Sequence, residues 1–173
     1  MKKVTAKPQL GFGEAVKLAM SRLTDIKGRS RRSEFWWSML AFIIVYFIVN
    51  SIFELVLPLM AAQIISTFLM LLAMPLTIRR LQDTGKSMWW VIVSWLASAV
   101  MNIYMVSSGA LEALTSVNPD PDAAINMFKS PVYIGCAFVS TVAGIATFIF
   151  CLLDSKPETN KYGESPKYVI EEI

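Results

Sequence analysis

Four long stretches of the chain carry no Asp, Glu, Lys or Arg, and short polar segments separate them. These stretches are 35–53, 55–78, 87–111 and 130–153. An α-helix rises about 1.5 Å per residue, so about 20 apolar residues cross a hydrocarbon core of about 30 Å. Lipid cannot satisfy unpaired backbone groups, so each stretch is predicted to be helical. The pattern predicts an all-α integral membrane protein, a four-transmembrane-helix bundle in a single membrane domain (1–173). The predicted spans are about 35–53, 59–78, 88–107 and 131–153.

Residues 10–26 show a different helical pattern, with one apolar face and one polar face. The apolar face carries Phe12, Ala15, Val16, Ala19, Met20 and Leu23. This spacing predicts an amphipathic helix that lies flat on the membrane surface or packs on a partner. Gly28 is predicted to end this helix, and the basic residues 1–9 are expected to be loose.

Capping and breaking residues mark several boundaries. Ser33 is expected to cap the first span, and Pro75 to bend the inner end of the second. Pro131, after Ser130, is expected to begin the fourth span. The run Asn118-Pro119-Asp120-Pro121-Asp122 predicts an irregular loop over 108–130.

Basic residues predict the orientation in the membrane. Of the 16 Lys and Arg residues, nine lie in 1–34, three in the 79–86 loop and three in the tail 154–173. The opposite side holds only Lys129. Because basic residues stay on the cytoplasmic side, both termini are predicted to be cytoplasmic. Hydrophobic residues make up 55% of the chain and charged residues 17%, against about 25% charged in an average soluble domain.

Small residues recur at packing intervals in the last two spans. Ser94 and Ser98 mark one face of the third span, and Ser140 and Gly144 belong to a similar face of the fourth. Such stripes let helices approach closely. Packing within the bundle is the favoured interpretation, and a homo-oligomer face is the alternative.

The residue types exclude several chemistries. The chain has no His, and its two cysteines, Cys136 and Cys151, lie on one apolar helix. No catalytic residue, metal site, cofactor or nucleic-acid partner is therefore expected. No charged residue lies inside a predicted span, which disfavours proton-coupled transport.

Three amides lie at similar depth near the outer ends of three spans. They are Asn50, Gln63 and Asn102. The favoured interpretation is an intramembrane polar cluster that holds the helices together by hydrogen bonds. A polar pocket open to the outside is the alternative.

Two cytoplasmic segments combine arginines with acids. The first holds Arg29, Arg31, Arg32 and Glu34, and the second holds Arg79, Arg80, Asp83 and Lys86. Turn-forming Gly28 and Gly85 accompany them. One interpretation is that the arginines set the orientation and reach lipid headgroups. The other is an organised surface where arginines bind an anion and acids hold them in place.

Three strings stand out in the polar segments: Gly28-Arg29 with Arg32, Glu34, Phe35 and Trp36; Arg79-Arg80-Leu81 with Asp83, Thr84, Gly85, Ser87, Trp89 and Trp90; and Asn160-Lys161-Tyr162-Gly163 with Pro166. Together they resemble the domain of unknown function 805 family, the YhaH-like bacterial inner-membrane proteins. Gln82 departs from the family, where His is frequent, and Met88 stands where Gly is frequent. The resemblance implies a multi-pass protein of the bacterial inner (plasma) membrane. It implies no activity.

The leading hypothesis is a non-enzymatic membrane module whose basic cytoplasmic face binds an anionic lipid headgroup or a partner protein. Arg29, Arg32, Arg79 and Arg80 would contact the anion, and Glu34 and Asp83 would orient them. The segment from Asn160 through Gly163 to Pro166 would fold back as a lid. The alternatives are a small channel or facilitator for a neutral solute, and a lipid-headgroup enzyme.

Overall fold

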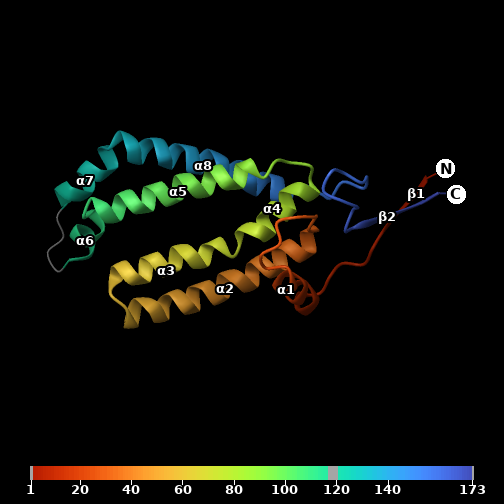
Figure 1. Cartoon of the computed structure of the whole chain (residues 1–173), viewed down its shortest axis with the longest axis horizontal. Helices are drawn as coiled ribbons and strands as arrows, with labels where there is room; N and C mark the ends of the chain where they lie inside the picture. The colour runs from red at the N-terminus through yellow and green to blue at the C-terminus, as the bar shows by residue number, and fades with distance from the viewer. Residues whose placement is uncertain (1, 117–120, 173) are drawn as a thin grey trace. The chain divides into compact units, whose positions relative to one another are not determined.

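The computed structural model describes residues 2–116 and 121–172, which fall into two compact units (Figure 1). The first unit comprises Met1–Met88 and Phe148–Ile173, and the second comprises Trp89–Thr147. Four helices are long and apolar enough to cross a membrane: Arg32–Val56, Ala61–Asp83, Trp89–Ser107 and Pro131–Leu152. The prediction of four helices long and apolar enough to span a membrane is confirmed.

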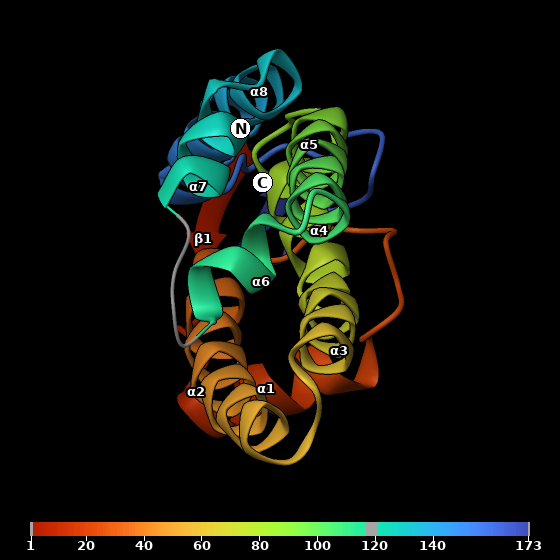
Figure 2. The ribbon, with the colours of Figure 1, turned by 90° about the vertical axis from the view of Figure 1, so that its left-hand side faces the viewer.

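In the first unit, two apolar helices form a hairpin. They are α2 (Arg32–Val56) and α3 (Leu59–Leu71), and they lie side by side (Figures 1 and 2). Pro58 takes the N-cap position of α3, where its missing N–H costs no helical hydrogen bond. The connection between the two helices is short, since α2 ends at Val56 and α3 begins at Leu59.

The second predicted span consists of two helical segments. Helix α3 ends at Leu71, and α4 runs over Met74–Asp83. The N–H of Leu72 bonds the carbonyl of Leu69 at 3.0 Å, a tighter pattern than the α-helical one. Pro75 follows in the first turn of α4, where it has no N–H to continue the helical ladder. The predicted bend near Pro75 is confirmed.

Helix α1 (Phe12–Ser21) packs against the beginning of α2. Ala15 is fully buried, and its carbonyl accepts a hydrogen bond from Ser38 Oγ at 3.0 Å. The helix is shorter than the predicted 10–26, because its regular hydrogen bonding stops at Ser21. Gly28 does not end α1. It lies further along, with φ +94°, in the segment that leads to α2.

The expected cap of α2 is also corrected. Arg31 is the N-cap residue and the helix begins at Arg32, so Ser33 lies inside the first turn. Its hydroxyl accepts a hydrogen bond from the N–H of Leu10 at 3.3 Å. Ser33 therefore binds the segment before α1 and does not cap its own helix.

The two ends of the described chain pair as strands. Strand β1 (Lys2–Ala6) runs antiparallel to β2 (Tyr168–Glu172), with Val4 opposite Ile170. The expectation that residues 1–9 are loose is wrong for 2–6. A strand whose partner lies at the other end of the chain has no local sequence signal.

The second unit contains α5 (Trp89–Ser107), α6 (Ala110–Thr115), α7 (Pro121–Lys129) and most of α8 (Pro131–Leu152). Much of the predicted irregular loop 108–130 is therefore helical. Proline fits the first position of a helix, so Pro121 begins α7 as Pro131 begins α8. Asn118, Pro119 and Asp120 lie outside the described residues.

Small polar residues join α5 to α8. The hydroxyls of Ser98 and Ser140 are 2.8 Å apart, and Ser94 Oγ donates to the carbonyl of Ser140 at 3.4 Å. A side-chain carbon added at Gly144 would lie 3.6 Å from Ser94 Oγ. The small residues therefore serve contacts within the bundle, as the favoured interpretation predicts.

Candidate functional site

The last two turns of α4 carry three charged residues into the interior of the first unit. Arg79, Arg80 and Asp83 are all 0% exposed. Arg80 and Asp83 are three residues apart, so they lie on one face of the helix. Burying a charge in this way is costly unless each group finds partners. We call the set formed by Arg29, Glu34, Arg79, Arg80 and Asp83 the arginine network.

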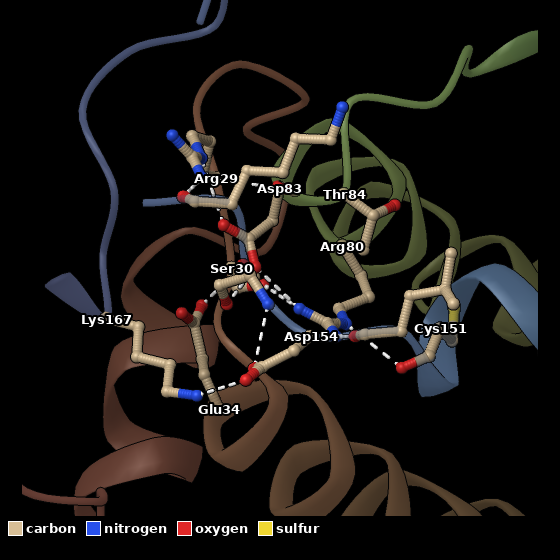
Figure 3. A network of polar contacts seen from close by, with 12 residues as sticks. Arg29, Ser30, Glu34, Arg80, Asp83, Thr84, Cys151, Asp154 and Lys167 are labelled. Atoms are coloured by element: carbon tan, nitrogen blue, oxygen red, sulfur yellow. Dashed lines mark hydrogen bonds and ion pairs between the residues drawn. The ribbon is translucent and has the colours of Figure 1, made fainter. Parts of the chain in front are cut away.

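Asp83 is the acid that joins two of the arginines (Figure 3). It accepts from Arg29 Nε at 3.0 Å and from Arg80 Nη1 at 2.6 Å. Ser155 Oγ donates a third hydrogen bond at 2.5 Å. One carboxylate thus compensates two buried guanidinium groups that lie far apart in the sequence.

Arg29 holds the tail of the chain against this carboxylate. Besides Asp83 Oδ1, its guanidinium donates to the carbonyl of Asp83 at 3.2 Å and to that of Lys156 at 2.5 Å. It also donates to the carbonyls of Glu158 at 2.8 Å and Gly163 at 3.3 Å. These bonds use all five of its N–H groups.

Arg80 binds the end of α8. Its Nε donates to the carbonyl of Cys151 at 3.1 Å, its Nη1 to that of Ser30 at 3.3 Å, and its Nη2 to that of Leu153. The last carbonyls of a helix have no partner within the helix and carry partial negative charge. A buried cation at this position therefore satisfies groups that would otherwise be left without hydrogen bonds.

Arg79 and Glu34 form the second half of the network. Ser30 Oγ donates to Glu34 Oε1 at 2.8 Å and accepts from Arg79 Nε at 3.2 Å. Arg79 Nη1 also donates to the carbonyls of Arg22, at 2.7 Å, and Asp25. Its Nη2 is 3.8 Å from Glu34 Oε1, an ion pair beyond hydrogen-bond length.

Of the remaining predicted residues of the cytoplasmic motifs, some lie beside the arginine network and others lie outside it. Asn160 lies beside the network, because its Nδ2 donates to the carbonyl of Gln82, the residue before Asp83, at 2.9 Å. Gly28, Gly85 and Gly163 have positive φ values of +94°, +74° and +125°, which glycine adopts without strain. Arg32 is exposed and lies outside the network.

The predicted intramembrane amides belong to two units, Asn50 and Gln63 to the first and Asn102 to the second. Asn50 accepts a hydrogen bond from Ser66 Oγ and donates to Glu54 Oε1 at 2.7 Å, so it links α2 to α3. The backbone carbonyl of Gln63 accepts from Thr67 Oγ1 at 2.8 Å. Asn102 belongs to α5 of the second unit.

A pocket of about 270 Å³ opens where α2 begins. We call it the interfacial pocket, and it is lined by Gln9, Arg31, Arg32, Ser33, Trp36, Trp37, Asp154 and Lys167. Arg31 is part of the frame, because it donates to the carbonyls of Pro8 at 2.6 Å and Lys7 at 3.2 Å. The side chain of Arg32 forms no hydrogen bond or ion pair with the residues that the structure describes.

An ion pair closes one side of the interfacial pocket. Lys167 Nζ lies 2.5 Å from Asp154 Oδ2, and both side chains are partly exposed (Figure 3). The hydrogen bond from Lys167 holds the pKa of Asp154 below its ordinary value, and the same bond raises the pKa of Lys167. Both groups are therefore charged at neutral pH, and with Arg31 and Arg32 the pocket has a net positive charge.

Sequence reasoning missed several members of these sites. Ser30 bridges Glu34 and Arg79, Ser155 bonds Asp83, and Asp154, Lys167 and Gln9 line the interfacial pocket. Trp36 and Trp37, adjacent at the start of a span, were the one available signal for the pocket, because tryptophan favours the headgroup level. The carbonyl acceptors carry no signal, since every residue has one. Within residues 2–116 and 121–172, no cluster of three or more metal-ligating side chains occurs.

The fold and the site define a class: a multi-pass helical membrane protein whose polar motifs meet in one buried ionic network. Residues 23–164 match the family described as "Protein of unknown function (DUF805)". The chain belongs to that family, as the resemblance indicated. No curated protein and no solved structure gives a significant match.

Proposed function

We propose that this protein is a non-enzymatic module of the bacterial inner membrane that binds an anionic lipid headgroup in the interfacial pocket. Both termini and the arginine network lie on the cytoplasmic side in this proposal. The basis for that orientation is the excess of Lys and Arg in 1–34, the 79–86 loop and the tail.

The observation that carries the proposal is the composition of the interfacial pocket. Trp36 and Trp37 belong to the first turns of a spanning helix, where aromatic residues favour the headgroup level. Arg32 and Lys167 add cations at the same depth. A phosphate oxygen between them would gain charge-assisted hydrogen bonds, which are stronger than neutral ones.

The arginine network has a supporting role in this proposal. Arg29 and Arg80 donate their N–H groups to protein oxygens, so their contribution is to hold 151–163 in place. That segment includes Asp154, which positions Lys167. Of the four arginines expected to contact the anion, this proposal keeps Arg32, and it adds Lys167, which lines the same pocket. Glu34 and Asp83 orient the other arginines.

The test compares two variants that lose the same charge. Arg32→Gln removes a cation of the pocket, whereas Lys17→Gln removes an exposed cation of α1 outside it. Each protein is mixed with phosphatidylglycerol or phosphatidylcholine in detergent, and bound lipid is counted by native mass spectrometry. Loss of a charge-assisted hydrogen bond costs about 1.5–3 kcal/mol, so Arg32→Gln should weaken phosphatidylglycerol binding about 10-fold to 100-fold.

The control distinguishes a specific headgroup site in the interfacial pocket from general electrostatic attraction between anionic lipid and a basic protein. Lys17→Gln should bind phosphatidylglycerol as the unmodified protein does. The unmodified protein and Lys17→Gln should each retain less phosphatidylcholine than phosphatidylglycerol. If Arg32→Gln and Lys17→Gln retain equal amounts of phosphatidylglycerol, the pocket does not recognise the headgroup. The proposal then fails, and a partner protein becomes the occupant to test.

A further inference from the structure

A second concavity in the first unit has a different chemistry. It is a groove of about 300 Å³ between α1, α2, α3 and α4, and we call it the α1 groove. Its walls come from Val16, Ala19 and Met20 of α1 and from Leu23 just after it. The other walls are Ser38–Val49 of α2 and Leu69–Arg79 across α3 and α4. Most of the lining side chains are aliphatic or aromatic. The α2 and α3 walls belong to spanning helices, so the medium around them is hydrocarbon.

The shape of the α1 groove suits an extended chain. Along α2 the lining residues run from Ser38 to Val49, which at about 1.5 Å per residue is about 16 Å. Water is a poor occupant, because a buried water needs two to four polar partners and apolar cavities stay dry. A long apolar groove beside lipid is filled best by a hydrocarbon chain.

The inner end of the α1 groove is polar. Arg79 is the one charged side chain among its described lining residues, and it lies at the end nearest the arginine network. Glu34 is its acidic partner, at 3.8 Å from Nη2. The guanidinium of Arg79 is fully buried and is bonded to Ser30, Arg22 and Asp25, so it is not free to bind a lipid head. The opposite end of the groove continues along α2 and α3 toward the membrane centre. A lipid in the groove is therefore held through its hydrocarbon chain.

The α1 groove and the interfacial pocket are separate sites. Trp36 lines the pocket and Ser38 lines the groove, and at 3.6 residues per turn these positions are about 200° apart around α2. One lipid therefore does not explain both. The groove also explains why α1 carries apolar side chains such as Val16 and Ala19, because they line it.

The geometry points to a lipid site in the α1 groove, distinct from the general lipid shell, that holds one acyl chain of a phospholipid along its apolar lining. The inference does not depend on the interfacial pocket. Helix α1 covers the chain from the cytoplasmic side. The site would keep its lipid after extraction, whereas lipid on the outer faces of α2 and α3 would exchange.

Photochemical labelling tests this assignment. The protein is reconstituted with phosphatidylglycerol that carries a diazirine in one acyl chain, irradiated, and mapped by peptide mass spectrometry. Adducts should concentrate on the groove residues Met20, Phe42 and Leu72 over the outward-facing Ile44 and Phe68. The same chain on phosphatidylcholine should label the groove to the same extent, because the apolar lining binds the chain and Arg79 is bonded within the protein.

Two filling variants and one control complete the test. Ala41→Trp and Ala19→Trp place a large ring in the groove from two different helices, and each should reduce adducts on Met20 to the level found on Ile44. Ile44→Trp adds the same ring on the outer face and should leave the groove adducts unchanged. Protection of Cys151 from alkylation shows that each variant is folded. Uniform labelling of groove and outer faces, or filling variants that keep the Met20 adducts, would overturn the assignment.

Discussion

Replacing Asp83 with Asn removes the charge that compensates two buried arginines while it keeps the size of the side chain. Asp83 pairs with Arg29 at 3.0 Å and with Arg80 at 2.6 Å, and all three side chains are at most 1% exposed. Removing one partner of a buried ion pair costs about 3–5 kcal/mol. The amide oxygen of Asn still accepts one hydrogen bond, which offsets about 1 kcal/mol. The expected cost is therefore about 2–4 kcal/mol.

Alkylation of Cys151 measures this cost in the folded protein. Cys151 is 2% exposed, and its carbonyl is bound by Arg80. A maleimide therefore reacts with it when the end of α8 opens. The experiment uses a Cys136→Ser background, so that one thiol remains. When opening is fast relative to reaction, the rate follows the open population. At about 1.36 kcal/mol per tenfold change, Asp83→Asn should accelerate labelling roughly 30-fold to 1,000-fold.

The matched control is Asp154→Asn, which breaks an ion pair of the same type at the surface. Lys167 and Asp154 have side chains 25% and 46% exposed, and such pairs contribute at most about 1 kcal/mol. Labelling of Cys151 should change by less than about fivefold. If Asp83→Asn labels within about twofold of the parent, the buried network does not stabilise this end of the molecule and the reasoning is refuted.

Three further predictions concern the backbone, the second unit and pH. Gly85→Ala should lower the free energy of unfolding by about 1 kcal/mol, because φ is +74° there, and an unchanged thermal midpoint would contradict this. With the native thiols replaced by Ser, the pair Ser98→Cys and Ser140→Cys should form a disulfide within one chain on oxidation, whereas a covalent dimer would favour the oligomer interpretation. The contribution of the Asp154–Lys167 pair should be lost as pH falls below the ordinary Asp value of 3.8, through the lowered pKa of Asp154. It should also be lost as pH rises above the ordinary Lys value of 10.5, through the raised pKa of Lys167, so hydrogen exchange of 168–172 should be constant between these limits once corrected for the intrinsic rate.

Part of the cytoplasmic site could be predicted from sequence. The charges at Arg29 and Asp83 stand next to turn-forming glycines, and a four-span topology brings both segments to the same side of the membrane. Their burial could not be predicted, because isolated arginines at span ends usually reach toward headgroups. The interfacial pocket could not be predicted either, since Asp154 and Lys167 look like ordinary polar residues of a tail.

The spans, the bend at Pro75 and the family were determined by the sequence alone. A charge-free stretch of about 20 residues beside lipid has one stable backbone solution, so local composition is enough. Tertiary structure decided what the charged motifs do. Arg29 and Arg80 bind carbonyls of 151–163, and a carbonyl becomes an acceptor for a distant guanidinium when folding brings the tail back to α4. Burial then turns residues that resemble a basic surface into an internal framework, because a charge removed from water must be paired where it lies.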